Sequence, residues 1–459
     1  MQKNGTYCGK VSALGTGGEG IINAEGTTAF VPFCLVGEEV SFKALKVKGN
    51  IAYGKIEKVI SPSPARVKAP CPVFEKCGGC DLQHIEYSEQ LKFKQNLVKT
   101  SLEKLGGIKF TVGDCVPCER QYAYRNKLSL PIGVSDNGET VLGFYARHSH
   151  RIVPITNCAI HKGWTGEIIR AVKEFATPQN RDFLKHIVVR ELNGKFIFAL
   201  VASRNIDIAP LAKLLDKSFE NFTLLLNVNP ADTNVIFGKE WHICRGEGFF
   251  SAEEGGITYR AGANTFVQVN DGIREKLYSA VINEIADKDT VAIDLYSGGG
   301  LLTAMLAKKC KAAYGVEIVQ EASDCAERLK IENGLENMHN ICGAVEEKLQ
   351  GVLQSTEGAK RVIVCDPPRK GIQRSAVQAI KNSGADKVVL ISCNPATLAR
   401  DLGLLSSTLR EENGALIKCP VPENPPYILQ SITPFDMFPQ TRHVECVVCL
   451  TRKSQRIRQ

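Results

Sequence analysis

Residues 291–308, with the sequence VAIDLYSGGGLLTAMLAK, contain the pattern that decides the fold of the C-terminal half. The apolar run at 291–296 predicts a buried strand, and the run at 301–308 has the spacing of a helix. Three glycines separate the two runs, and a glycine lets the backbone approach a ligand closely because it has no Cβ. A strand, a glycine-rich loop and a helix in this order are typical of a sheet that binds a nucleoside cofactor.

The rest of residues 263–459 continues this alternation of strand and helix patterns. Strands are predicted at 312–316, 361–365, 387–392 and 445–451, and helices at 320–333 and 374–382. Alternation of this kind predicts a doubly wound, mainly parallel, Rossmann-like α/β sheet.

The two regions before this sheet have different patterns. Residues 1–60 contain short apolar runs broken by glycines, together with several lysines, which predicts a small β-barrel of the OB type. The sequence SPSP at 61–64 is typical of a linker. Residues 61–262 combine a helix at about 88–105 with strands such as 127–132, so we expect a central α+β domain.

Composition limits the class of protein. The chain has 459 residues, which favours two or three domains, and a net charge of +8, which is compatible with a polyanionic partner. No apolar run approaches the roughly 18 residues of a membrane span, and the first residues do not resemble a signal peptide. Seventeen cysteines without a secretion signal favour a reducing compartment. We therefore expect a cytoplasmic monomer without a membrane partner.

Two acidic residues follow predicted strands of the C-terminal sheet. Glu317 ends the strand after the glycine-rich loop, where a carboxylate can bind ribose hydroxyls. Asp366, in CDPPRKG at 365–371, ends another strand and is placed to bind a cofactor or a base edge. Loop and acidic residues together indicate a nucleoside cofactor, but they do not separate NAD from S-adenosylmethionine.

A third strand end carries a candidate nucleophile. Cys393 lies in SCNP at 392–395, directly after the apolar run 388–391, and Glu445 comes from a later stretch. A thiolate is the nucleophilic form of cysteine, and a carboxylate can move a proton. The pair therefore suits covalent catalysis. His443 is a second candidate base, although we interpret it as a hydrogen-bonded structural histidine.

Five motifs together resemble the RNA (uracil-5-)-methyltransferases, and the resemblance extends through essentially the whole chain. They are FVQVN at 266–270, DLY at 294–296, DPPR at 366–369, SCNP at 392–395 and HVE at 443–445. Ser297 departs from the family, whose members often carry cysteine at that position, but the backbone role of the loop does not depend on it.

The resemblance implies a class I enzyme that uses S-adenosylmethionine, with Cys393 as the nucleophile and Glu445 as the base. Thiolate attack at uracil C6 puts electron density on C5, which takes the methyl group before Glu445 removes the C5 proton. The target nucleotide should be flipped out of its stack, with Phe266 stacking near the base. Four residues are implied to contact S-adenosylmethionine: Gln268, Tyr296, Glu317 and Asp366.

The resemblance also suggests a substrate. The N-terminal barrel is similar to the TRAM domain, an RNA-binding module, and a cysteine-rich centre is typical of the ribosomal RNA branch of the family. The predicted product is thus 5-methyluridine in 23S ribosomal RNA. Transfer RNA is the alternative substrate, and a non-catalytic RNA-binding iron–sulfur protein is the second alternative. The domains are predicted at 1–60, 61–262 and 263–459.

Cysteines in the central region have the spacing of metal ligands. Cys71, Cys77 and Cys80 lie close together, and Cys158 follows much later. From spacing alone, zinc and an iron–sulfur cluster are comparable possibilities, and the Cys-x-x-Cys at 115–118 could supply ligands instead of Cys158. The resemblance implies a four-iron four-sulfur cluster with Cys158 as the fourth ligand.

A basic and aromatic stretch lies beyond this cluster. Tyr124, Arg125 and Lys127 fall within four residues, with Arg147 and Arg151 nearby. Such patches suit RNA backbone contact and base stacking. We expect Arg125 and Lys127 to contact the RNA.

Overall fold

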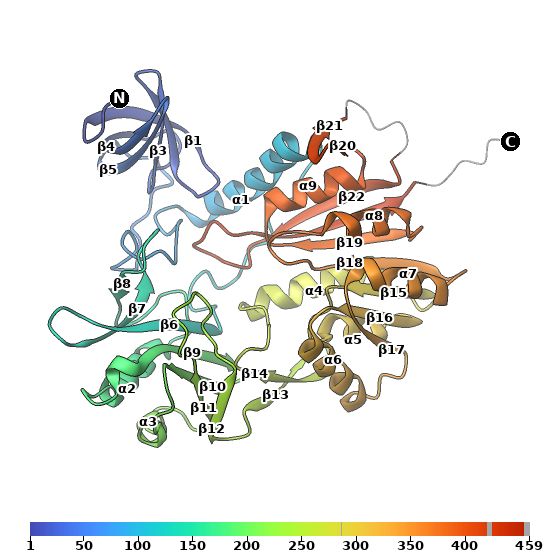
Figure 1. Ribbon diagram of the computed structural model, residues 1–459. Coiled ribbons are helices and arrows are strands. Elements are labelled where there is room, and N and C mark those ends of the chain that lie inside the picture. The colour runs from blue at the N-terminus through green and yellow to red at the C-terminus, as the bar shows by residue number, and fades with distance from the viewer. Residues whose placement is uncertain (286, 420–424, 454–459) are drawn as a thin grey trace.

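The computed structural model describes residues 1–285, 287–419 and 425–453, which form a barrel and two larger sheets (Figure 1). The blue N-terminal barrel lies at one end of the molecule, and the green central sheet lies opposite the orange C-terminal sheet. No helix in these described ranges is both long and apolar enough to cross a membrane.

The N-terminal barrel closes in the order β1-β2-β3-β5-β4, which confirms the predicted small barrel. Its strands alternate inward and outward side chains, as in β4, where Val40, Phe42 and Ala44 are fully buried. Closure removes the free strand edges that would otherwise pair with other chains. The strands are β1 (Thr6–Leu14), β2 (Gly20–Ala24), β3 (Thr27–Val31), β4 (Glu39–Lys48) and β5 (Ile51–Ser61).

A buried ion pair fixes the barrel to the segment that follows it. The Glu38 carboxylate is fully buried and accepts N–H bonds from Leu35 at 2.8 Å, Ser63 at 3.1 Å and Arg66 Nε at 2.6 Å. Burial alone raises the pKa of Glu38, but these hydrogen bonds hold it below its ordinary value. The sequence SPSP, predicted as a linker, is therefore anchored at Ser63.

The central region forms a seven-stranded sheet in the order β12-β11-β10-β9-β6-β7-β8. Helices α2 (Thr165–Phe175) and α3 (Ala209–Leu215) bury their apolar faces in one core with this sheet. The hairpin of β13 (Phe249–Glu254) and β14 (Ile257–Gly262) then leads into the C-terminal region. The strands of the large sheet are β6 (Lys127–Val134), β7 (Thr140–Tyr145), β8 (Ile152–Pro154), β9 (Leu184–Leu192), β10 (Lys195–Ala202), β11 (Phe222–Val228) and β12 (Glu240–Arg245).

The C-terminal sheet has the order β17-β16-β15-β18-β19-β23-β22, and its first five strands are parallel. The predicted doubly wound fold is confirmed, with apolar clusters on both faces of the sheet. Its strands are β15 (Thr290–Leu295), β16 (Ala312–Glu317), β17 (Met338–Cys342), β18 (Lys360–Cys365), β19 (Lys387–Ser392), β22 (Tyr427–Phe435) and β23 (Glu445–Arg452). Its helices are α4 (Asp271–Ile285), α5 (Leu301–Ala307), α6 (Gln320–Glu332), α7 (Val345–Ser355), α8 (Arg374–Asn382) and α9 (Pro395–Leu405). A small hairpin, β20 (Leu409–Glu412) and β21 (Ala415–Lys418), follows α9.

Helix α1 (Tyr87–Ser101) precedes the central sheet in sequence but packs on the C-terminal one. Val98 and Leu102 belong to the same apolar cluster as Leu398 and Leu402 of α9. The predicted helix at about 88–105 is confirmed, with its last turn at Leu102–Gly106 in π-helical form, and it ends at Gly107, which has a φ of +66°.

Candidate active site

A cavity of about 1220 Å³ lies between the central and C-terminal sheets. Segments that are far apart in the sequence meet there, which only the tertiary structure could establish. Glu317 is not among the described residues that line this cavity. The other predicted site residues all line it: Cys393, Glu445, Gln268, Tyr296, Asp366, Phe266, Arg125, Lys127, Cys71, Cys77, Cys80 and Cys158.

The register of two strands places Cys393 beside Glu445. Strands β19 and β23 are antiparallel, and their register pairs Ser392 with Cys446. One step further along the same register, the residue after Ser392 lies opposite the residue before Cys446. The thiol and the carboxyl group therefore lie next to each other at the edge of the cavity.

Burial makes both groups hard to ionise in this state. Burial and the Glu445 charge together raise the pKa of the Cys393 thiol to about 11, although the charge of Arg369 opposes the increase. Glu445 is only 4% exposed, and burial, followed by the charge of Asp366, raises the pKa of its carboxyl group well above the ordinary value. Positive charge entering the cavity would favour the ionised forms of both.

The SCNP motif connects β19 to α9. The Asn394 side chain caps the helix by accepting the Ala396 N–H at 3.1 Å, and Pro395 occupies the first turn, where its missing N–H costs nothing. Cys393 thus lies just before a helix N-terminus. The positive end of the helix dipole favours a thiolate there.

The glycine-rich loop is held tightly at the end of β15. The N–H groups of Tyr296 and Ser297 both donate to the Val316 carbonyl, at 2.9 and 3.1 Å. Tyr296 has a φ of +65°, a left-handed conformation that is strained for a residue with a Cβ. Gly300 also has a positive φ, and a Cβ there would lie 2.6 Å from that of Ala326. The loop therefore requires glycine at this position.

Glu317 holds the loop rather than lining the cavity. Its carboxylate accepts the N–H of Gly298 at 2.9 Å and the N–H of Val319 at 2.8 Å. The carboxylate therefore lies beside the glycine loop. Its role as a ribose contact stays a prediction.

Two further carboxyl groups lie at the ends of β15 and β18. The register pairs Leu295 with Cys365, so the crevice residues Tyr296 and Asp366 leave the sheet side by side. Burial raises the pKa of Asp366 to about 7, and burial with the charges of nearby carboxylates does the same for Asp294. Acidic groups in a buried crevice suit a positively charged ligand.

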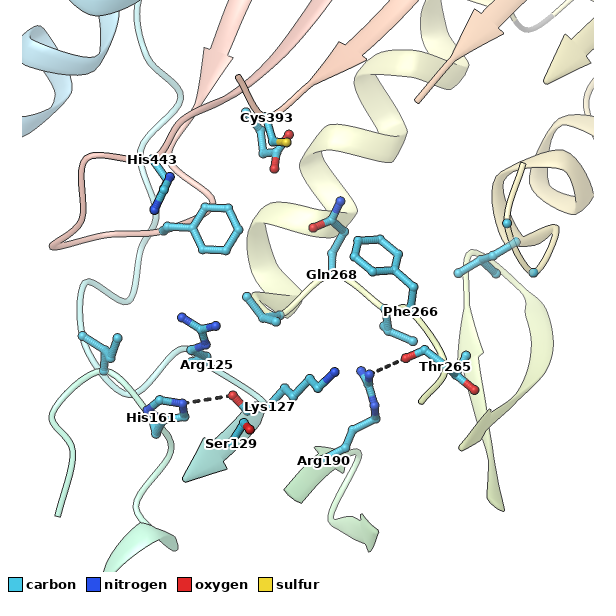
Figure 2. A pocket seen from close by; sticks show the side chains of 18 of the residues that line it. Arg125, Lys127, Ser129, His161, Arg190, Thr265, Phe266, Gln268, Cys393 and His443 are labelled. Carbon is cyan, nitrogen blue, oxygen red and sulfur yellow. Dashed lines mark hydrogen bonds between the residues drawn. The ribbon is translucent and has the colours of Figure 1, made fainter. Parts of the chain in front are cut away.

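The segment before α4 places Phe266 and Gln268 in the middle of the cavity (Figure 2). Phe266 is 77% exposed, which is unusual for a large apolar side chain and leaves its ring free to stack. The Gln268 carbonyl accepts N–H bonds from Asn126 at 3.3 Å and Arg274 at 3.2 Å. These bonds fix the backbone and leave the Gln268 amide facing the cavity.

The predicted RNA-contact patch divides in the structure. Arg125 and Lys127 line the cavity, but Tyr124 is buried and donates its hydroxyl to the Pro439 carbonyl at 3.0 Å, so it is not free to stack on a base. Arg147 binds the Asp81 carboxylate at 2.9 Å and therefore has a structural role. The expectation of base stacking by this patch is wrong for Tyr124.

Four cysteines meet at one side of the cavity. Cys71, Cys77, Cys80 and Cys158 all line it, and burial raises the pKa of Cys80 to about 12 and that of Cys158 to about 11. The charges of Cys158, Cys77 and Cys71 also contribute to this increase in the pKa of Cys80. Metal ions or clusters stabilise thiolates that burial alone disfavours.

No metal site is shown at these thiols. In the described part of the chain, no three His, Cys, Asp or Glu side chains are arranged to hold a metal ion. The four-iron four-sulfur cluster that the resemblance implies therefore stays a proposal.

The alternative Cys-x-x-Cys lies elsewhere. Cys118 donates its S–H to the Arg120 carbonyl at 3.0 Å and accepts an N–H from Asn270 at 3.2 Å, and neither it nor Cys115 lines the cavity. Cys158 instead lies beside His161, whose Nε2 donates to the Lys127 carbonyl at 3.0 Å. These contacts favour Cys158 over Cys115 or Cys118 as the fourth thiol.

His443 differs from its expected role. Its ring lines the cavity and packs edge-on against Phe438, with ring centres 5.9 Å apart, and it has no hydrogen-bond partner among the described residues. The interpretation as a hydrogen-bonded structural histidine is therefore wrong. Burial and the charges of Arg369 and Arg442 lower the pKa of His443 to about 4, so the ring is neutral at pH 7.

Two cavity residues were missed from the sequence. Arg190 lies in the apolar run of β9, where a single arginine among buried residues was the available signal. Arg369 is part of the DPPR motif and lines the cavity with Cys393 and Glu445, where its charge opposes the increase in the pKa of both groups. The sequence shows that Arg369 belongs to the motif, but it does not show that Arg369 lies near β23, which begins at Glu445.

Comparison with known proteins gives one consistent family. A family model described as tRNA (uracil-5-)-methyltransferase matches residues 86–421. An uncharacterized RNA methyltransferase of Clostridium tetani is 36% identical over 98% of this chain and 97% of its own length. A second one, of Halalkalibacterium halodurans, is 35% identical over 99% of this chain and 98% of its own length.

A solved structure shares the whole arrangement. The tRNA (uracil-54, C5)-methyltransferase of Pyrococcus abyssi, in complex with S-adenosyl-L-homocysteine, superposes with a TM-score of 0.76. It is 25% identical and covers 97% of this chain and 99% of its own, so the similarity includes most of the N-terminal barrel as well as both sheets.

Proposed function

The chain belongs to the family of RNA (uracil-5-)-methyltransferases, and we propose that it methylates C5 of specific uridines in 23S ribosomal RNA through a covalent bond from Cys393. It is an S-adenosylmethionine-dependent RNA methyltransferase. S-adenosylmethionine supplies a methyl group on a positively charged sulfonium centre. Nucleophile, base and binding surface come from the residues of the cavity.

Cys393 and Glu445 divide the reaction between them. Uracil C5 is a weak nucleophile, so the Cys393 thiolate first adds to C6. The new C6–S bond leaves an electron pair at C5 that takes the methyl group, while the methyl–sulfonium bond breaks and leaves a neutral thioether. Glu445 then accepts the proton that remains on C5, the C6–S bond breaks, and Cys393 leaves as a thiolate. The observation that carries this proposal is the β19–β23 register, which brings the thiol and the carboxyl group together.

The other cavity residues hold the two substrates. Phe266, with its ring exposed in the cavity, would stack on the flipped uracil. Tyr296, Asp366 and the loop held by Glu317 would bind S-adenosylmethionine, because acidic groups at the strand ends favour its sulfonium charge. The side-chain amide of Gln268 would donate hydrogen bonds to S-adenosylmethionine or accept them from it.

Ribosomal and transfer RNA are both compatible with the barrel. The Pyrococcus abyssi structure belongs to a tRNA enzyme and still covers 97% of this chain, so a barrel does not exclude tRNA. We favour 23S ribosomal RNA because the cysteine-rich centre resembles the ribosomal branch, and we retain tRNA as the second candidate. Unmodified transcripts of both RNAs, methylated separately with labelled donor, distinguish them. Faster transfer to tRNA would overturn the ribosomal assignment.

We further propose that Cys71, Cys77, Cys80 and Cys158 hold a four-iron four-sulfur cluster. The support is that all four thiols line the same cavity, with Cys77 and Cys80 buried and Cys71 and Cys158 half-buried. Such a cluster supplies a rigid cross-link between distant segments, and we assign it no step in methyl transfer.

Substitution of the nucleophile tests the covalent mechanism. Cys393→Ala should abolish methyl transfer but leave the binding of labelled S-adenosylmethionine within about twofold, because the thiol is required only for attack at C6. Cys244→Ala is the matched control, since this thiol is exposed on β12 outside the cavity. Residual transfer at more than a few per cent of the wild-type rate in Cys393→Ala would exclude the mechanism.

A further inference from the structure

Three basic side chains form a floor on the central-domain side of the cavity. Lys127 begins β6, Arg125 lies two residues before it, and Arg190 lies on β9. The β6–β9 register pairs Lys127 directly with Arg190, so their side chains leave the sheet on the same face. All three line the cavity, opposite Cys393, with Gln268 and Phe266 between (Figure 2).

Arg190 is the most buried of these cations. It is 1% exposed, and within the described part of the chain only one of its nitrogens, Nη2, has a partner, which is the Thr265 carbonyl. Its Nε and Nη1 atoms are buried without a hydrogen-bond partner among the described residues, as is the Nε atom of Arg125. Buried, unpaired donors on a charged group are costly, so their retention suggests a partner that is present only when a ligand binds.

Nearby acids do not neutralise this floor. Glu191 and Asp271 both bind Lys162, and Glu254 binds Arg274. Among the described residues, no carboxylate forms an ion pair with Arg125, Lys127 or Arg190. Burial, followed by the charges of Arg190 and Arg125, lowers the pKa of Lys127 to about 8, as expected for like charges held close together.

We propose that Arg190, Lys127 and Arg125 together bind a backbone phosphodiester of the RNA, next to the uridine whose base is held at Cys393. The inference rests on the proposed function and adds Arg190 to the substrate-binding residues. A phosphodiester is an acceptor-only anion, and it can accept the Lys127 ammonium and the guanidinium N–H groups together. When the uracil of the RNA points past Phe266 towards Cys393, the RNA backbone lies on the other side of the cavity, next to these three basic side chains.

The salt dependence of RNA binding tests this site. Unmodified 23S and tRNA transcripts are titrated with the full-length protein without methyl donor, so that binding is measured separately from catalysis. Arg190→Gln should weaken RNA binding by about tenfold at 0.1 M salt and reduce the slope of log K against log salt by roughly 0.7 to 0.9. Arg190→Lys should retain the slope, because the charge is retained.

Three measurements complete the test. Lys185→Gln is the matched control, because it removes a charge from the same strand outside the cavity and should leave the slope unchanged. Binding of labelled S-adenosylmethionine should stay within twofold in Arg190→Gln. If circular dichroism shows that Arg190→Gln does not fold, Lys127→Gln carries the test with the same expected loss of slope.

Two results would overturn the proposal. One is an unchanged slope and affinity for RNA in both Arg190→Gln and Lys127→Gln. The other is weaker binding of S-adenosylmethionine with unchanged RNA binding, which would mean that these cations face the carboxylate of the methyl donor. Failure of the wild-type protein to methylate either RNA would refute the proposed function without changing these binding results.

Discussion

Lys94 and Asp436 form a buried ion pair that connects α1 to the loop before the catalytic strand. Both side chains are fully buried, and the Lys94 ammonium also donates to the Phe438 carbonyl at 3.0 Å. Asp436 additionally accepts the Tyr87 hydroxyl at 2.7 Å. The loop that these bonds hold continues into β23, which begins at Glu445.

Lys94→Met should therefore lower the free energy of unfolding much more than an average substitution does. It removes both Lys94 bonds and leaves the Asp436 carboxylate buried with the Tyr87 hydroxyl as its remaining side-chain donor in the described structure. Loss of one partner from a buried ion pair costs about 3–5 kcal/mol, because the other charge stays uncompensated. That is a large fraction of the 5–15 kcal/mol typical of folded proteins. The double variant Lys94→Met, Asp436→Leu should recover most of the loss, since no unpaired charge remains.

Guanidinium unfolding followed by circular dichroism measures these differences, and methyl transfer measured under native conditions reports the effect on Glu445. Lys92→Met is the control on the same helix, because Lys92 is exposed and its ion pair in the described structure is with Glu89 across one helical turn, so little change is expected. The reasoning from burial would be refuted if Lys94→Met lowered the free energy of unfolding no more than Lys92→Met does. It would also be refuted if the double variant were no more stable than Lys94→Met.

Four further predictions follow from the site. Glu445→Gln should stall after attack and leave a protein–RNA adduct on a denaturing gel; absence of an adduct would point to another base. Anaerobically purified protein should contain about four iron atoms per chain; Cys158→Ser should lose them and Cys115→Ser should not, and the reverse pattern would exclude Cys158 as a ligand. Removal of residues 1–60 should raise the apparent KM for RNA far more than that for S-adenosylmethionine, and equal changes would argue against RNA binding by the barrel. Burial raises the pKa of Asp294 in the folded state to about 7, so its contribution to stability is present at acid pH and is lost as the pH rises towards 7. Between pH 4 and pH 7, the free energy of unfolding of Asp294→Asn should thus rise relative to that of the wild type by at most about 4 kcal/mol. Parallel pH profiles of unfolding for the two proteins would contradict this.

Local pattern was sufficient for much of the fold. Apolar runs identified β15, β16, β18 and β19, because buried parallel strands are almost continuously apolar. The alternation did not predict β17, α7 or α9. Met338–Cys342 is short and only partly buried, so it lacks the apolar signal of a central strand. The packing of α1 on α9 was equally invisible, since it joins residues about 300 positions apart.

For the site, the sequence by itself determined the family, the candidate nucleophile, base and thiols, because short motifs combine side-chain chemistry with a strand end or a glycine turn. The tertiary structure alone decided which of these groups meet. The antiparallel pairing of β19 with β23 places Glu445 beside Cys393, and the pairing of β6 with β9 places Arg190 beside Lys127. It also decided that Tyr124 is buried while Phe266 is exposed. Register and burial depend on contacts between distant segments, and no local pattern of residues specifies those contacts.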